Sequence, residues 1–211
     1  MNREEVKKIL LAQAWDEVVR LALVDRSILR TLFGLLYDAD DYIHWLAIEA
    51  IGRVGGATAA SDEEKTREMV RRLLWNLNDE SGGTPWGSVG AIGAIAASRP
   101  DLFGHYLSQL FPFHEDMSFA AELIWAVVLV GRHRPELAEE YIPFLFAAMG
   151  HDRPAIRGYA AWAAGALALK EAGAPLACLQ SDHTPVAVYL GQGMYVHTTI
   201  AALAADSAAK L

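Results

Sequence analysis

The chain has 211 residues, of which 53% are hydrophobic and 21% charged, so it can bury a large core and is unlike a disordered chain. Its formal net charge of −8 argues against nucleic acid as a partner, because phosphate binding needs an excess of Lys and Arg, and it favours a basic protein or peptide. Cys178 is the single cysteine, which excludes an internal disulfide and a cysteine-based zinc site. With no apolar run of bilayer length, we expect a cytoplasmic protein with no membrane partner.

Apolar residues recur with helical spacing along most of the chain, which predicts an all-α protein. We expect helices at residues 3–13, 16–24, 27–37, 41–54, 62–77, 85–97, 101–111, 117–131, 136–149, 154–169 and 175–180. The loosest internal loop is expected at 56–62, which reads Gly-Ala-Thr-Ala-Ala-Ser-Asp.

The C-terminal stretch departs from helical spacing. Apolar residues alternate with others on both sides of a Gly-Gln-Gly turn at 191–193, which predicts a small β-hairpin, and a closing helix at 200–210 follows. The alternating residues are Val186, Val188, Leu190, Met194 and Val196. We expect 1–180 to form a helical array and 181–211 to pack on it as a hairpin and capping helix, in one domain overall.

Two of the predicted helices align without a gap at a spacing of 35 residues. Residues 99–102, Arg-Pro-Asp-Leu, correspond to residues 134–137, Arg-Pro-Glu-Leu, and apolar positions continue to match downstream. A proline is tolerated in the first turn of a helix, and the acid after it favours the positive end of the helix dipole. Both segments therefore indicate the start of a repeated first helix.

A second helix follows each first helix and carries a motif of its own. The aligned triplets are Ala50-Ile51-Gly52, Ala91-Ile92-Gly93, Ala126-Val127-Val128 and Ala163-Ala164-Gly165. Their spacings are 41, 35 and 37 residues, and a polar turn that carries acids precedes each helix. A period in this range is typical of arrays of two-helix repeats.

These residues resemble the HEAT repeat, in the short form that also occurs in phycobilisome-lyase-like proteins. The best match is at Asp152, Ile156, Arg157, Ala160, Ala163, Ala164, Gly165 and Leu167. The resemblance covers roughly residues 25–170, and it implies an α-α superhelix, that is, a HEAT-like solenoid. Residues 74–83 are also similar to a group of small, uncharacterised bacterial HEAT-repeat proteins.

Four tryptophans fall on the second helices, on the side away from the motif alanines: Trp45, Trp86, Trp125 and Trp162. In a solenoid this side lines the concave surface. Three interpretations stay open: the rings are core, covered by neighbouring repeats and the C-terminal segment; they line a groove for a peptide or other ligand; or they form a homodimer interface.

The turn before the helix expected at 85–97 offers a second candidate site, formed by Asp79, Glu80, Gly82 and Gly83. Backbone N–H groups of a glycine-rich turn at a helix start can bind an anion, and the alternative is a plain turn that needs positive φ angles. His114 and His151 occupy equivalent turns of adjacent repeats, which lie too far apart to share a metal ion. We therefore expect no metal and no cofactor.

The sequence contains no recognisable catalytic motif, so we expect no catalytic residues. The function that it favours is a non-enzymatic scaffold that binds a protein or peptide on the surface of stacked helical repeats. The alternative is a HEAT-like enzyme or accessory protein, since the resemblance extends to bilin lyases and alkylpurine DNA glycosylases. The acidic charge and the lack of catalytic motifs weigh against that alternative.

Overall fold

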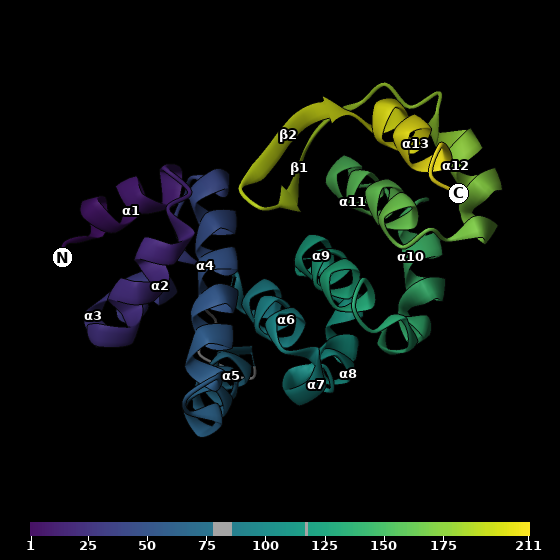
Figure 1. Ribbon diagram of the computed structural model, residues 1–211. Helices are drawn as coiled ribbons and strands as arrows, with labels where there is room; N and C mark the ends of the chain where they lie inside the picture. Colours follow the sequence, from purple (N-terminus) through teal and green to yellow (C-terminus); the bar gives the residue numbers. More distant parts are fainter. Residues whose placement is uncertain (78–85, 117) are drawn as a thin grey trace. The chain divides into compact units, whose positions relative to one another are not determined.

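The computed structural model describes residues 1–77, 86–116 and 118–211 (Figure 1). Over these residues the protein is mostly helical, with one two-stranded antiparallel sheet, so the predicted helical class and the predicted hairpin are confirmed. Among the described helices, none combines the length and the hydropathy that a bilayer crossing requires.

The described chain forms two compact units, Met1–Tyr106 and Leu107–Leu211. Unit 1 contains α1 (Arg3–Leu11), α2 (Trp15–Val24), α3 (Arg26–Leu35), α4 (Asp41–Ala59), α5 (Glu63–Leu77), α6 (Ser88–Ser98) and α7 (Pro100–Phe103). Helix α8 (Tyr106–Leu110) begins at the boundary. Unit 2 contains η1 (Phe111–Glu115), α9 (Ala120–Gly131), η2 (Pro135–Leu137), η3 (Glu139–Tyr141), α10 (Ile142–Ala148), α11 (Pro154–Ala166), η4 (Lys170–Ala172), α12 (Gly173–Leu179), β1 (Pro185–Gly191), β2 (Met194–Thr199) and α13 (Ile200–Ala208).

Helix α4 is the centre of unit 1, because α1, α2, α3, α5 and α6 all pack against it (Figure 1). It begins after Asp40, whose carboxylate accepts hydrogen bonds from the backbone N–H groups of Tyr42 and Ile43 at 2.9 and 3.3 Å. Most residues between Ile43 and Val54 are buried. A helix that is apolar nearly all round is stable only when neighbours cover it on every side.

The prediction of a loop at 56–62 is wrong over most of this range, because α4 continues to Ala59. The glycines of this region allow close packing on α6. A Cβ added at Gly52 would lie 2.5 Å from the Cβ of Ala94, and one at Gly55 would lie 2.8 Å from the Cγ1 of Ile95. Glycine is required at these two positions by the close approach of the two helices.

The helices expected at 101–111 and 136–149 are interrupted. The first is divided into α7, α8 and η1, and the second into η2, η3 and α10. Four of these short segments carry a proline in their first turn: Pro100, Pro112, Pro135 and Pro143. Because proline lacks an N–H group, a helix is easily restarted at such a residue and poorly continued through it.

Helix α11 is the centre of unit 2, where α9, α10, β1 and α13 pack against it (Figure 1). The hairpin pairs Val188 with Val196, and Gly191 and Gly193 adopt positive φ angles of 93° and 72° at its turn. Tyr189 of β1 is fully buried. The hairpin and α13 therefore contribute side chains to the core of unit 2.

Candidate functional site

The four tryptophans singled out in the sequence have different environments. Trp45, Trp125 and Trp162 are buried, with exposed fractions of 6%, 0% and 5%, whereas 51% of Trp86 is exposed. Asp79, Glu80, Gly82 and Gly83 lie outside the described residues. The anion site predicted in that turn therefore stays a prediction.

In unit 2 the hairpin covers the indole of Trp125. The ring centres of Trp125 and Tyr189 are 5.9 Å apart. The backbone N–H of Tyr189 donates to the hydroxyl of Tyr159 at 2.9 Å, and the hydroxyl of Tyr189 accepts from the N–H of Gly193 at 3.0 Å. This environment favours the interpretation of Trp125 as core over the groove and the homodimer interface.

The two turn histidines bond within their own turns. Nδ1 of His114 lies 2.6 Å from the carbonyl oxygen of Phe111, and Nδ1 of His151 accepts from the N–H of Arg153 at 3.0 Å. Across the described part of the chain, no group of three His, Cys, Asp or Glu side chains is placed to hold a metal ion.

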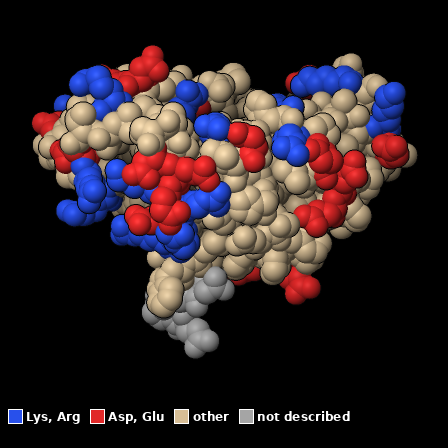
Figure 2. Space-filling view, turned by 60° about the horizontal axis from the view of Figure 1, so that its bottom comes forward, with Lys and Arg blue, Asp and Glu red and all other residues tan. Residues whose placement is uncertain are grey.

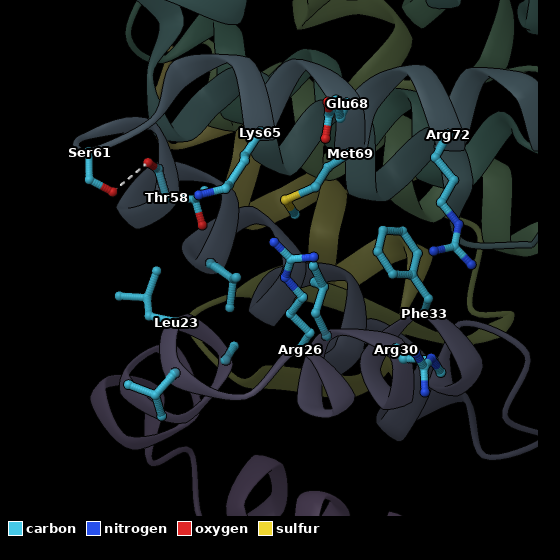
Figure 3. A pocket seen from close by; sticks show the side chains of 14 residues that line it. Leu23, Arg26, Arg30, Phe33, Thr58, Ser61, Lys65, Glu68, Met69 and Arg72 are labelled. Atoms are coloured by element: carbon cyan, nitrogen blue, oxygen red, sulfur yellow. Dashed lines mark hydrogen bonds between the residues drawn. The ribbon is translucent and has the colours of Figure 1, made fainter.

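A groove in unit 1, which the sequence analysis did not predict, is the best candidate site (Figure 3). Its volume is about 560 Å³, within the range of pockets that bind ligands. Its lining comes from four consecutive helices and the α4–α5 turn. The lining residues are Ala22, Leu23, Val24, Arg26, Leu29, Arg30, Phe33, Val54, Thr58, Ser61, Lys65, Glu68, Met69 and Arg72.

The floor of the groove is apolar. Phe33 of α3, Val54 of α4 and Met69 of α5 are buried. At the α2 end of the groove, Leu23 and Val24 are instead exposed, with fractions of 51% and 77%. Apolar side chains that line a concavity and remain in contact with water are a surface that a partner can cover.

The walls of the groove are basic. Arg26 and Arg30 are four residues apart on α3, so they lie on one side of that helix, and Lys65 and Arg72 occupy one side of α5 in the same way. In Figure 3, Lys65, Met69 and Arg72 extend from α5 toward α3, while the Arg26 side chain extends from the opposite wall. Among the described residues of the lining, Glu68 is the only one with a carboxylate, so the groove is locally positive in a chain of net charge −8.

The arginines of the groove differ in their partners from five other arginines of unit 1. Ion pairs join Arg3 to Asp38, Arg53 to Glu49, Arg67 to Glu63, Arg71 to Glu64 and Arg99 to Asp101. Among the residues that the structure describes, Arg26, Arg30 and Arg72 make no ion pair with a carboxylate. The guanidinium of Arg72 lies 5.0 Å from the ring centre of Phe33, and Lys65 pairs with Asp62 at 2.9 Å on the surface.

The lining holds cations, hydroxyl groups, one carboxylate and apolar side chains, a set suited to binding an anion with an apolar part. It has no histidine or cysteine. The signal for this groove was present in the sequence: Arg26, Leu29, Arg30 and Phe33 repeat a basic and apolar alternation at helical spacing, as do Lys65, Met69 and Arg72. What the sequence did not supply is that the two helices face each other.

No protein-family profile matches the chain. An uncharacterised protein of Archaeoglobus fulgidus is 30% identical over 86 residues, which are 40% of this chain and 43% of that protein. The chain therefore matches less than half of the length of this relative. The relative's description assigns it no activity, ligand or partner.

Proposed function

We propose that the protein is a non-enzymatic scaffold of HEAT-like helix pairs and that the groove of unit 1 binds a segment of a partner protein. The observation that carries the proposal is a set of arginines around an apolar floor that form no ion pair with any described carboxylate, with Leu23 and Val24 exposed beside it. A protein surface that leaves both cations and apolar side chains uncovered is suited to association, because a partner can satisfy both at once.

The repeat interpretation is supported by two close approaches in the same register. A Cβ at Gly52 of α4 would meet Ala94 of α6, and a Cβ at Gly165 of α11 would meet Ser207 of α13. Gly52 and Gly165 are the aligned glycines of the repeat motif, and each contacts a residue 42 positions later. On this interpretation α12 and α13 are the last helix pair, and the hairpin is an insertion between its members.

The distribution of charged side chains favours peptide binding over DNA binding, the function that the glycosylase alternative implies. The groove cations would also attract phosphate groups, so DNA is the second ligand class to test. On the face shown in Figure 2, however, acidic and basic side chains are interspersed among the described residues. Duplex DNA requires a broad basic surface, whereas the groove places its cations around a small apolar floor.

The test of the proposal is an unbiased selection of displayed peptides against the full chain. The selected peptides are synthesised, and their dissociation constants are measured for the wild type, Val24→Asp and Leu11→Asp. Val24 lines the groove and Leu11 does not, and both are exposed, so neither variant disturbs the core. We expect Val24→Asp to weaken binding at least tenfold and Leu11→Asp to leave it within a factor of two. A selection without enrichment, or peptides insensitive to Val24→Asp, would refute groove binding.

A further inference from the structure

We infer that the groove receives an amphipathic helix whose acidic side chains flank a short apolar stripe. The inference rests on the proposed function and names the chemistry of the partner. Although the net charge of −8 predicts a basic partner for the chain as a whole, a ligand in the groove meets the local charge, which is positive. Local charge controls contact pairs, because surface charges farther away than about 8–10 Å are screened by salt.

The two basic walls match the charge pattern of such a helix. Arg26 and Arg30 stand on one wall, and Lys65 and Arg72 on the other, with the apolar floor between them (Figure 3). At a rise of about 1.5 Å per residue, the pairs span roughly 6 and 10 Å along their helices, which are one and two turns. A ligand helix that carries acids on both sides of its apolar stripe would present a carboxylate to each wall.

Three of the four groove cations have no acid partner among the described residues, and the fourth, Lys65, has an exposed one. In the described part of the chain no acid pairs with Arg26, Arg30 or Arg72, so ligand binding breaks no ion pair at these three positions. The pair between Lys65 and Asp62 is solvent-exposed, with side-chain fractions of 56% and 37%. Exposed pairs of this kind contribute little to stability and can exchange partners. Guanidinium groups also bind carboxylates in a two-pronged geometry that adds orientation to attraction.

The apolar floor of the groove determines which apolar side chains the ligand can place there. Leu23 and Val24 are exposed at one end, and the buried Phe33 and Met69 lie further in. The volume of about 560 Å³ suits a few large side chains rather than a whole domain. Met69 can adjust its rotamer to the shape of an incoming side chain, since methionine is flexible and polarizable.

A helical ligand fits the groove better than an extended one. The lining comes from helices and the turn between α4 and α5, so an inserted strand would meet no sheet edge that could satisfy its backbone. A helix satisfies its own backbone hydrogen bonds and needs only side-chain contacts, which is the mode of helix-in-groove recognition. A small organic anion is disfavoured, because a pocket for one buries most of the ligand surface, and here all four cations lie in solvent.

The experiment uses two labelled model peptides with the same leucine stripe at positions i, i+3, i+4 and i+7. One has glutamate on both flanks of the stripe, and the other has lysine. Fluorescence anisotropy gives their dissociation constants, and that of a short labelled DNA duplex, for the full chain. The glutamate peptide is also measured with Val24→Asp, and both peptides with the paired variants Arg26→Glu/Arg30→Glu and Lys8→Glu/Arg20→Glu. The second paired variant changes the net charge equally, at exposed cations outside the groove.

We expect the glutamate peptide to bind the wild type at least tenfold more tightly than the lysine peptide, with affinity that falls as salt rises. Arg26→Glu/Arg30→Glu should weaken it at least tenfold, and Lys8→Glu/Arg20→Glu by no more than twofold. Equal binding of the two peptides, equal effects of the two variants, or tighter binding of a short DNA duplex would overturn the inference. If the displayed peptides require Val24 while the glutamate peptide does not bind, the inference fails and the proposed function stands. If neither the displayed peptides nor the glutamate peptide requires Val24 for binding, the inference and the proposed function both fail.

Discussion

The guanidinium carbon of Arg72 lies 5.0 Å from the ring centre of Phe33, so a cation of α5 covers an aromatic ring of α3 across the groove. The ring is buried and the arginine is exposed. The two residues therefore contribute differently: Phe33 supports the packing of unit 1, and Arg72 remains available to a ligand.

Substitutions at this contact should separate stability from binding. Phe33→Ala should lower the free energy of unfolding by about 3 kcal/mol, because it removes a buried ring. Arg72→Ala should lower it by no more than about 1 kcal/mol, the usual limit for an exposed cation–π contact, while it weakens binding of the glutamate peptide. Urea unfolding monitored by circular dichroism measures both values. Equal losses of stability would contradict this division of roles.

An acid-sensitive contact holds α1 to the turn between α3 and α4. Burial raises the pKa of the Asp38 carboxyl, but hydrogen bonds from Lys7, Arg3 and the N–H of Asp40 lower it by more, so the pKa falls from 3.8 to about 2. The pKa is lower in the folded state than in the unfolded state. Asp38 therefore stabilises the fold fully above pH 3.8, and this contribution is lost as the pH falls through about 2.

Asp38→Asn should accordingly lower the melting temperature at neutral pH, and the difference from the wild type should shrink as the pH falls below 3.8. Asp16→Asn is the matched control, since Asp16 is exposed and makes no ion pair in the structure as described. The ion pair of Asp182 with Arg157 remains in both proteins. A difference between wild type and Asp38→Asn that stays constant from pH 7 to pH 2 would rule out this role.

Two glycines of unit 2 should respond in opposite directions to alanine. A Cβ at Gly165 would lie 2.6 Å from the Cα of Ser207, a backbone atom that no rotamer change can move. Gly165→Ala should therefore destabilise the protein by about 1–3 kcal/mol. Gly173 has open space around it and a helical φ of −53°, so Gly173→Ala should stabilise by about 0.4–1 kcal/mol. Thermal unfolding of both variants measures these changes in stability. A Gly165→Ala variant as stable as the wild type would argue against the close approach of α11 and α13.

Removal of residues 184–211 should strongly destabilise unit 2. Val188, Tyr189, Ile200 and Leu203 are buried, and the deletion would expose the surface of α11 that they cover. Each large side chain contributes about 1.5–3 kcal/mol on burial before conformational entropy is subtracted. We expect a lower melting temperature and aggregation, measured by calorimetry and light scattering. A soluble truncated protein that melts within about 2 °C of the full chain would contradict the expectation.

The sequence predicted the features that depend on residues close together in the chain. It missed the features that depend on contacts between residues far apart in the chain. The cap at Asp40 and the alternation around residues 191–193 act within a few residues, and both predicted elements are present. Gly56 was assigned to the loop at 56–62, because its close approach to Ser98 involves a residue about 40 positions away in the chain. Burial of Trp125 likewise depends on Tyr189, which approaches from the hairpin.

The groove was missed for a similar reason. Each of its walls has a recognisable pattern, but Arg26 and Arg72 are 46 residues apart in the chain, and their apposition follows from packing. The net charge of the chain also concealed it, because a sum over all residues averages out a local positive patch. The net charge of the chain therefore predicted a basic partner for the surface as a whole. It did not predict the charge of a ligand that binds in the groove.

The contrast among the tryptophans gives the two units different optical properties. Both tryptophans of unit 2, Trp125 and Trp162, are shielded from water, whereas Trp75 and Trp86 of unit 1 are exposed. A soluble quencher such as iodide should extinguish the red-shifted emission of the exposed indoles and leave the blue emission of the shielded ones. With Trp15, which is half-buried, and Trp45 replaced by phenylalanine, the remaining blue signal would come from unit 2, so its unfolding could be followed separately within the intact chain.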